Sequence, residues 1–150
     1  MTRYVLHGKP RRYTGLFWFG ILTLGIAWAV YWFRAFREVD LQMGRRHSPL
    51  FFLAFIPLVG LLFSALYVHR EYTLLRADRV TLGLPPGPPP REVVAWIFPG
   101  ALILVGPAIA AMLCNVAING FWVELYRRVG QPVPVEIAAA LERAWRRSQA

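Results

Sequence analysis

Three long apolar runs contain no charged residue, and they cover residues 14–33, 48–68 and 93–123 of this 150-residue chain. All seventeen Lys and Arg residues and all eight Asp and Glu residues lie outside these runs. Hydrophobic residues make up 57% of the chain, above the roughly 45–50% typical of soluble domains. A chain of this length has too little interior to bury so much apolar surface, so we expect contact with lipid.

The length of each run suits a helix that crosses a bilayer, because about 20 residues at 1.5 Å each cover the ~30 Å hydrocarbon core. We predict an all-α integral membrane protein with hydrophobic helices over residues 14–36, 48–70 and 93–124. The third run is too long for one straight span, and Pro99-Gly100 offers a break. We expect the residues before Pro99 to lie at the interface, the span to follow, and Pro107 to kink it.

Two further segments complete this architecture. Residues 82–91 hold five prolines, which exclude a helix and favour a stiff connecting loop. Residues 134–149 form a predicted amphipathic helix, because Ile137, Leu141 and Trp145 recur every four residues while the arginines lie mainly away from that stripe. A helix on the membrane surface explains this pattern, and so does packing on a partner subunit.

The loop charges leave the topology of the first helix open. The Lys and Arg residues number four before the first run, four after it, four between the second and third runs, and five after the third. If all three runs cross, eight bases lie on one side and nine on the other, so no positive-inside bias exists. If the first run is re-entrant, thirteen Lys and Arg residues lie on one side of the membrane and four on the other. Its length favours a crossing, and the charges favour re-entry.

One segment, residues 22–38 with the sequence LTLGIAWAVYWFRAFRE, resembles the signature of the DUF4234 family of bacterial membrane proteins. The resemblance covers about 17 residues and implies a small multi-pass protein of the bacterial cytoplasmic membrane, but no activity. Ala27 stands where the family usually has Tyr. The NVAINGFW stretch from Asn115 to Trp122 is similar to the family's last helix. The positions in the signature that match are Thr23, Leu24, Gly25, Ile26, Tyr31, Trp32, Arg34 and Glu38.

The matching residues also have a physical interpretation. We expect Tyr31 and Trp32 to form an aromatic anchor at the interface, with Arg34 and Glu38 paired across one helical turn. A binding site for a lipid headgroup or a partner, built with Arg37, is the alternative interpretation.

A small and polar face on the third helix is the predicted packing surface. Two adjoining rows contribute to it at spacings of four residues, namely Gly106, Ala110 and Cys114 beside Ala111, Asn115 and Asn119. Small residues let helices approach, and amides hydrogen-bond between helices for about 0.6–2 kcal/mol each. We expect this face to hold the helices together or to bind a second subunit. The alternative is that this face lines a path for a solute.

Residue patterns that indicate catalysis are missing from the sequence. The acidic residues are scattered, His7, His47 and His69 have no ligand spacing, and Cys114 is expected to be an inert thiol. We therefore predict no cofactor, no enzymatic activity and no nucleic-acid partner. The expected function is an accessory or scaffold subunit that contacts anionic lipid headgroups and other membrane subunits or further copies of itself. A small transporter or channel formed by oligomerisation is the alternative.

Overall fold

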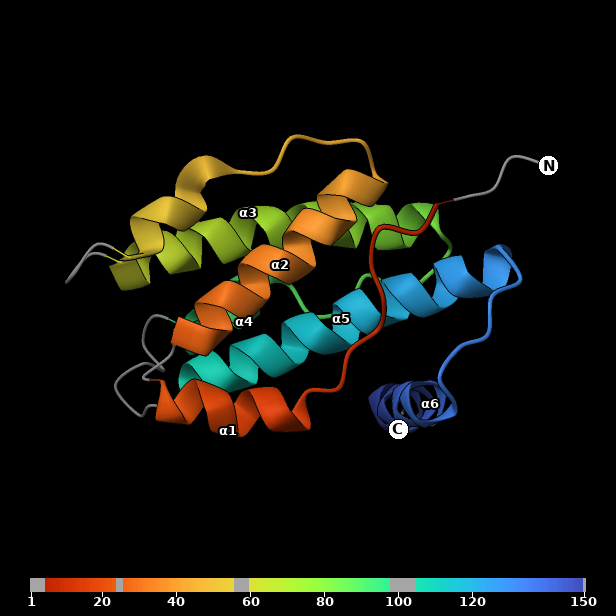
Figure 1. Ribbon diagram of the computed structural model, residues 1–150. Helices are drawn as coiled ribbons and strands as arrows, with labels where there is room; N and C mark the ends of the chain where they lie inside the picture. Colours follow the sequence, from red (N-terminus) through yellow and green to blue (C-terminus); the bar gives the residue numbers. More distant parts are fainter. Residues whose placement is uncertain (1–4, 24–25, 56–59, 98–104, 150) are drawn as a thin grey trace.

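A computed structural model describes residues 5–23, 26–55, 60–97 and 105–149 (Figure 1). Over these residues the chain forms only helices, and the expected all-α class is confirmed for them. Six are α-helices and one, η1, is a 3-10 helix. In chain order they are α1 (Thr14–Leu22), α2 (Ile26–Gln42), η1 (Pro49–Phe55), α3 (Gly60–Thr81), α4 (Pro90–Ile97), α5 (Gly106–Arg128) and α6 (Val135–Gln149).

The first apolar run forms two helices, α1 and α2, where a single helix was expected over residues 14–36. The side chain of Thr23 links them. Its hydroxyl donates to the Phe19 carbonyl at the end of α1 (2.8 Å) and accepts from the Ala27 N–H in the first turn of α2 (3.1 Å). A hydroxyl that bonds the backbone at the end of one helix and at the start of the next favours a helix boundary over a continuous helix.

The second run is also divided, between η1 and α3, and α3 continues eleven residues past the expected end at residue 70. This extension is stable because it buries Tyr72 and Leu75 in the core. In the third run, α4 ends at Ile97, and the expected break at Pro99-Gly100 lies outside the described residues. Pro107 lies in the first turn of α5, where backbone N–H groups have no partner within the helix, so the missing N–H of proline costs no hydrogen bond. Pro107 therefore belongs to the start of α5 and does not kink it, contrary to the expectation.

Each apolar run therefore contributes two helical segments that run in opposite directions. Figure 1 shows that α1, η1 and α4 run toward one end of the molecule, and that α2, α3 and α5 run back from it. Within each pair the two segments pack against each other. We call the end where all three pairs turn the apolar end, and the opposite end the charged end.

The connections at the charged end follow from Gly and Pro. The proline-rich loop covers residues 82–89, two residues shorter than expected, because Pro90 begins α4. Gly130, with a positive φ of 70°, follows the end of α5, and α6 corresponds to the amphipathic helix expected over residues 134–149. Ile137 of α6 is buried, and Glu136 forms an ion pair with Arg12 of the N-terminal segment.

Candidate functional site

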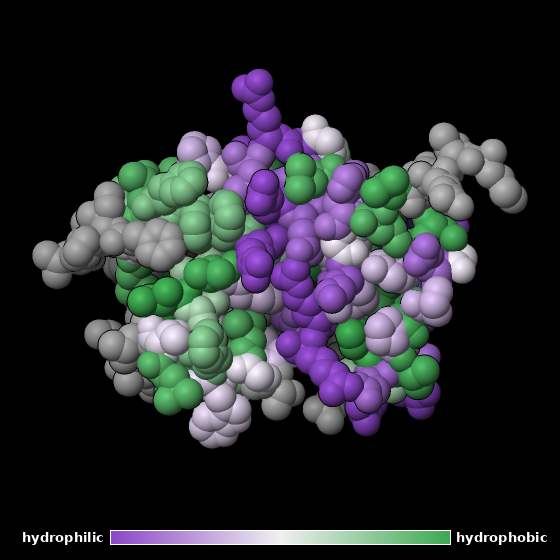
Figure 2. All heavy atoms as spheres, in the orientation of Figure 1, coloured by the Kyte–Doolittle hydropathy of each residue, from purple (hydrophilic) through white to green (hydrophobic). Residues whose placement is uncertain are grey.

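The apolar end exposes large hydrophobic side chains from several helices, among them Leu22, which is 80% exposed. In Figure 2 this surface is the mostly green left part, beside a purple, hydrophilic band and a right part where both colours mix. Soluble monomers rarely expose a continuous apolar area of this extent, so the apolar end is a candidate surface for contact with a membrane. Its exposed side chains are Trp18, Phe19, Ile21, Leu22, Ile26, Val30, Phe52, Leu61, Leu62, Leu66, Trp96, Val105 and Met112.

The depth of the apolar end can be worked out from the helices. The charge-free parts of α2 (residues 26–33) and α3 (residues 60–68) have eight and nine residues, or about 12 and 13 Å. The hydrocarbon of one leaflet is about 15 Å thick, half of the bilayer core. Exposed bases follow these segments directly, with Arg34 and Arg37 on α2 and Arg70 on α3. The apolar end therefore matches one leaflet in depth.

Among the described residues, α5 is the one helix long and apolar enough to cross a bilayer. A buried core helix of a soluble protein can meet the same criterion. Exposure along α5 is uneven, because Val105, Met112 and Val116 are exposed while no side chain between Ala117 and Val123 is. The part of α5 with exposed side chains, up to Val116, covers only about 16 Å.

The two asparagines of α5 lie inside the chain. Asn119 accepts a hydrogen bond from the Arg11 N–H and donates one to the Arg11 carbonyl, both at 2.8 Å. Asn115 donates to the same carbonyl (3.2 Å) and accepts from the Tyr31 hydroxyl (2.9 Å). These bonds fasten the N-terminal segment and α2 to α5. In this conformation both amides are satisfied within the chain, and both also border the open groove between α5 and α6.

The other members of the predicted small face, Gly106, Ala110, Ala111 and Cys114, are buried as well. The absence of long side chains lets α5 lie in the centre of the bundle, where it contacts α2, α3 and α4. The face thus packs helices of the same chain.

The family-like motif divides between the core and the surface. Tyr31 and Trp32 are buried in the core, so their rings do not face headgroups. Arg34 is exposed, and Glu38 forms its ion pair with Arg11 of the N-terminal segment. Thr23 joins α1 to α2 as described above, and Gly25 lies outside the described residues.

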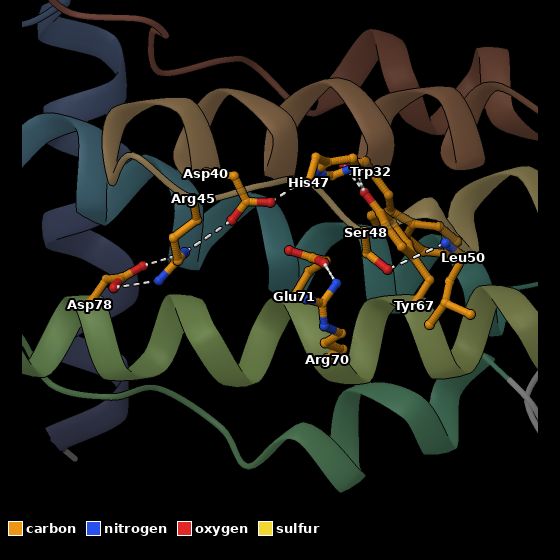
Figure 3. Close-up of polar contacts among 10 residues, drawn as sticks. All are labelled: Trp32, Asp40, Arg45, His47, Ser48, Leu50, Tyr67, Arg70, Glu71 and Asp78. Atoms are coloured by element: carbon orange, nitrogen blue, oxygen red, sulfur yellow. Dashed lines mark hydrogen bonds and ion pairs between the residues drawn. The ribbon is translucent and has the colours of Figure 1, made fainter.

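A buried polar cluster is the second notable feature, and Figure 3 shows it between α2 and α3. Asp40 near the end of α2 accepts from Arg45 (3.2 Å) and lies 2.8 Å from Nδ1 of His47. Arg45 also donates to both carboxylate oxygens of Asp78 on α3 (2.9 and 2.8 Å). The Nε2 atom of His47 lies 2.8 Å from the Tyr67 hydroxyl.

Glu71 of α3 brings a second carboxylate to Asp40. One ligand atom from each of Asp40, His47 and Glu71 can be chosen so that all three lie within 4.8 Å of one another. Both carboxylates are only 2% exposed. Burial, and then the neighbouring Asp40 carboxylate, raise the pKa of Glu71 to about 8. Two buried carboxylates this close need a proton or another cation between them.

Sequence reasoning missed this cluster. His47 shows no ligand spacing in the sequence, since Asp40 lies 7 residues before it and Glu71 lies 24 residues after it. The structure brings them together when α2 packs on α3. Helical spacing was a usable signal, because Tyr67, Glu71, Leu75 and Asp78 follow one another at three or four residues and share the buried face of α3.

No family model, curated protein or solved structure matches this chain. The resemblance to the DUF4234 family thus stays an expectation that rests on the 17-residue motif.

Proposed function

We propose that this chain is a non-catalytic accessory or scaffold protein of the bacterial cytoplasmic membrane that inserts three helical hairpins into one leaflet. One observation carries the proposal, namely that all three apolar runs turn back at the same end of the molecule (Figure 1). In the sequence analysis these runs were expected to be spans, with only the first open to re-entry. In the proposal all three are re-entrant.

Charge supports this arrangement. With three hairpins, the N-terminal segment, the loops after α2 and α3 and the tail after α5 all lie on one side of the membrane. All seventeen Lys and Arg residues then share that side, which satisfies the positive-inside rule that three crossings violate. The exposed bases that follow the apolar parts of α2 and α3 lie at the depth of anionic headgroups.

The topology can be tested with single cysteines in a Cys114→Ala background. The four segments at the charged end each offer an exposed site, so the variants are Lys9→Cys, Arg46→Cys, Arg91→Cys and Arg143→Cys. We expect a membrane-impermeant thiol reagent to label all four only after the cells are permeabilised. Three crossings would instead place positions 9 and 91 opposite positions 46 and 143, and that outcome would contradict the proposal.

A control cysteine at Leu22 tests the apolar end itself. The Leu22 side chain is exposed in the isolated chain, so lipid alone would protect it. We expect Leu22→Cys to resist the water-soluble reagent in membranes and to react once the protein is denatured. Reaction in intact membranes as fast as at Arg46→Cys would mean that the apolar end lies in water.

The accessory role is supported by α6, which packs on α5 at the edge of the bundle (Figure 1). An open groove of about 400 Å³ lies between α6, α5 and the N-terminal segment, with lining residues that include Asn119, Val116 and Leu141. We expect native mass measurement of the gently solubilised protein to show a stoichiometric partner or a homo-oligomer, and removal of residues 131–150 to release it. A monomer under the same conditions would refute this role.

A further inference from the structure

The cluster around Asp40, His47 and Glu71 joins three elements that are separate in sequence. Asp40 lies near the end of α2, His47 in the loop before η1, and Glu71 in the middle of α3 (Figure 3). The cluster lies beyond the apolar parts of both helices, so it belongs to the charged half of the molecule. It is therefore independent of how the chain meets the membrane.

With Asp40, Glu71 and Asp78 all ionised and His47 neutral, the charges in this cluster do not balance. Three carboxylates, those of Asp40, Glu71 and Asp78, meet the two guanidinium groups of Arg45 and Arg70. Arg45 bonds both oxygens of Asp78 and one oxygen of Asp40, and Arg70 is about half exposed. In that state one net negative charge remains next to His47, and its burial is costly unless a proton or a metal cation compensates it.

The surrounding contacts match those around metal ligands. A histidine that binds a metal through one ring nitrogen usually makes a hydrogen bond through the other, which fixes the ring. His47 has that arrangement, with Nδ1 toward Asp40 and Nε2 at 2.8 Å from the Tyr67 hydroxyl. The carboxylates are also held from outside the cluster, Asp40 by Arg45 and Glu71 by Arg70.

We propose that Asp40, His47 and Glu71 bind one divalent transition-metal ion. The ligands would be the Asp40 oxygen that now faces His47, the Nδ1 atom of His47 and one oxygen of Glu71. One imidazole and two carboxylates suit Zn²⁺, Mn²⁺ or Fe²⁺ better than Mg²⁺, which prefers oxygen ligands alone.

A metal ion here would cross-link the charged ends of the first two hairpins. The ion would hold the end of α2 and the loop before η1 against α3, where Arg45 and Asp78 already join the same elements. Metal binding would therefore stabilise the relative placement of two hairpins, which is a structural role and requires no substrate to reach the ion.

The test uses the full-length protein in detergent, dialysed against a chelator and then titrated with Co²⁺, whose visible absorption reports a site of nitrogen and oxygen ligands. We expect saturation at one ion per chain, competition by Zn²⁺, no competition by Mg²⁺ at equal concentration, and a higher melting temperature with Zn²⁺. The variants His47→Ala and Glu71→Gln should each weaken binding at least tenfold. The matched controls His69→Gln and Glu92→Gln change exposed residues and should bind as the wild type does.

Glu71→Gln keeps the size of the side chain, so its circular dichroism spectrum should remain that of the wild type and separate loss of metal from loss of fold. Absence of saturable Co²⁺ and Zn²⁺ binding by the wild-type protein would overturn the proposal and leave a shared proton as the cation between the two carboxylates. Binding that persists in both His47→Ala and Glu71→Gln would overturn it as well.

Discussion

Replacement of Gly20 by Ala tests the contact that closes the first hairpin. Gly20 lies on α1 where Trp28 of α2 crosses it. A Cβ atom added at Gly20 would lie 2.1 Å from two atoms of the Trp28 ring, well inside the 3.5–4.0 Å of ordinary contact. Trp28 is only 4% exposed, so its ring has little room to move.

The magnitude follows from two opposing effects. Overpacking of a buried contact costs about 1–3 kcal/mol, and an overlap this close with a rigid ring belongs at the upper end. Ala stabilises a helix over Gly by about 1 kcal/mol. We therefore expect Gly20→Ala to lower the free energy of unfolding by about 2 kcal/mol.

The matched control is Gly15→Ala on the same helix, where an added Cβ meets nothing within 4 Å. It gains helix propensity without a clash, up to about 1 kcal/mol. The two variants should thus differ by ~3 kcal/mol, or roughly 6–12 °C in melting temperature for a chain of this size, measured in the same detergent. If Gly20→Ala melts at the temperature of Gly15→Ala or above, α1 does not pack on α2 through this glycine, and the hairpin is refuted.

Two further predictions concern buried polar groups. Asn119→Leu removes both hydrogen bonds to the Arg11 backbone and leaves the Arg11 N–H unpaired, so the free energy of unfolding should fall by about 2–4 kcal/mol. The control Val116→Leu, on the exposed side of α5, should change the free energy of unfolding by less than about 0.5 kcal/mol. Equal effects of the two variants in chemical denaturation would contradict the role of Asn119 in holding the N-terminal segment on α5. In a chelator, no metal ion competes with the proton on Glu71. Between pH 4.5, the ordinary pKa of a glutamate, and pH about 8, the raised pKa of Glu71, the folded protein keeps a proton that the unfolded chain has lost. Folded stability should therefore fall as pH rises through that window, and more steeply than in Glu71→Gln; a parallel pH profile in the two proteins would show that Glu71 holds no such proton.

The sequence alone determined the helical class and the division of the chain into apolar and charged segments. Charge-free runs, a proline-rich loop over residues 82–89 and an amphipathic tail are local properties, and each has a counterpart in the structure. The start of α4 at Pro90 and the place of Pro107 in the first turn of α5 also have a local cause, because a proline without an N–H fits the first turn of a helix. From the sequence we nevertheless expected a loop at Pro90 and a kink at Pro107.

Tertiary structure decided how the runs are used. Hydropathy and length are the same for one crossing helix and for two helices that turn back, so the choice rested on contacts such as that of Gly20 with Trp28. By sequence alone, the asparagines could equally face a partner protein. In the structure they bind the backbone of Arg11, which is more than 100 residues away in the sequence. The cluster of Asp40, His47 and Glu71 likewise exists only because α2 packs on α3. Spacing along the chain could not reveal it, because packing and not sequence distance sets which side chains meet.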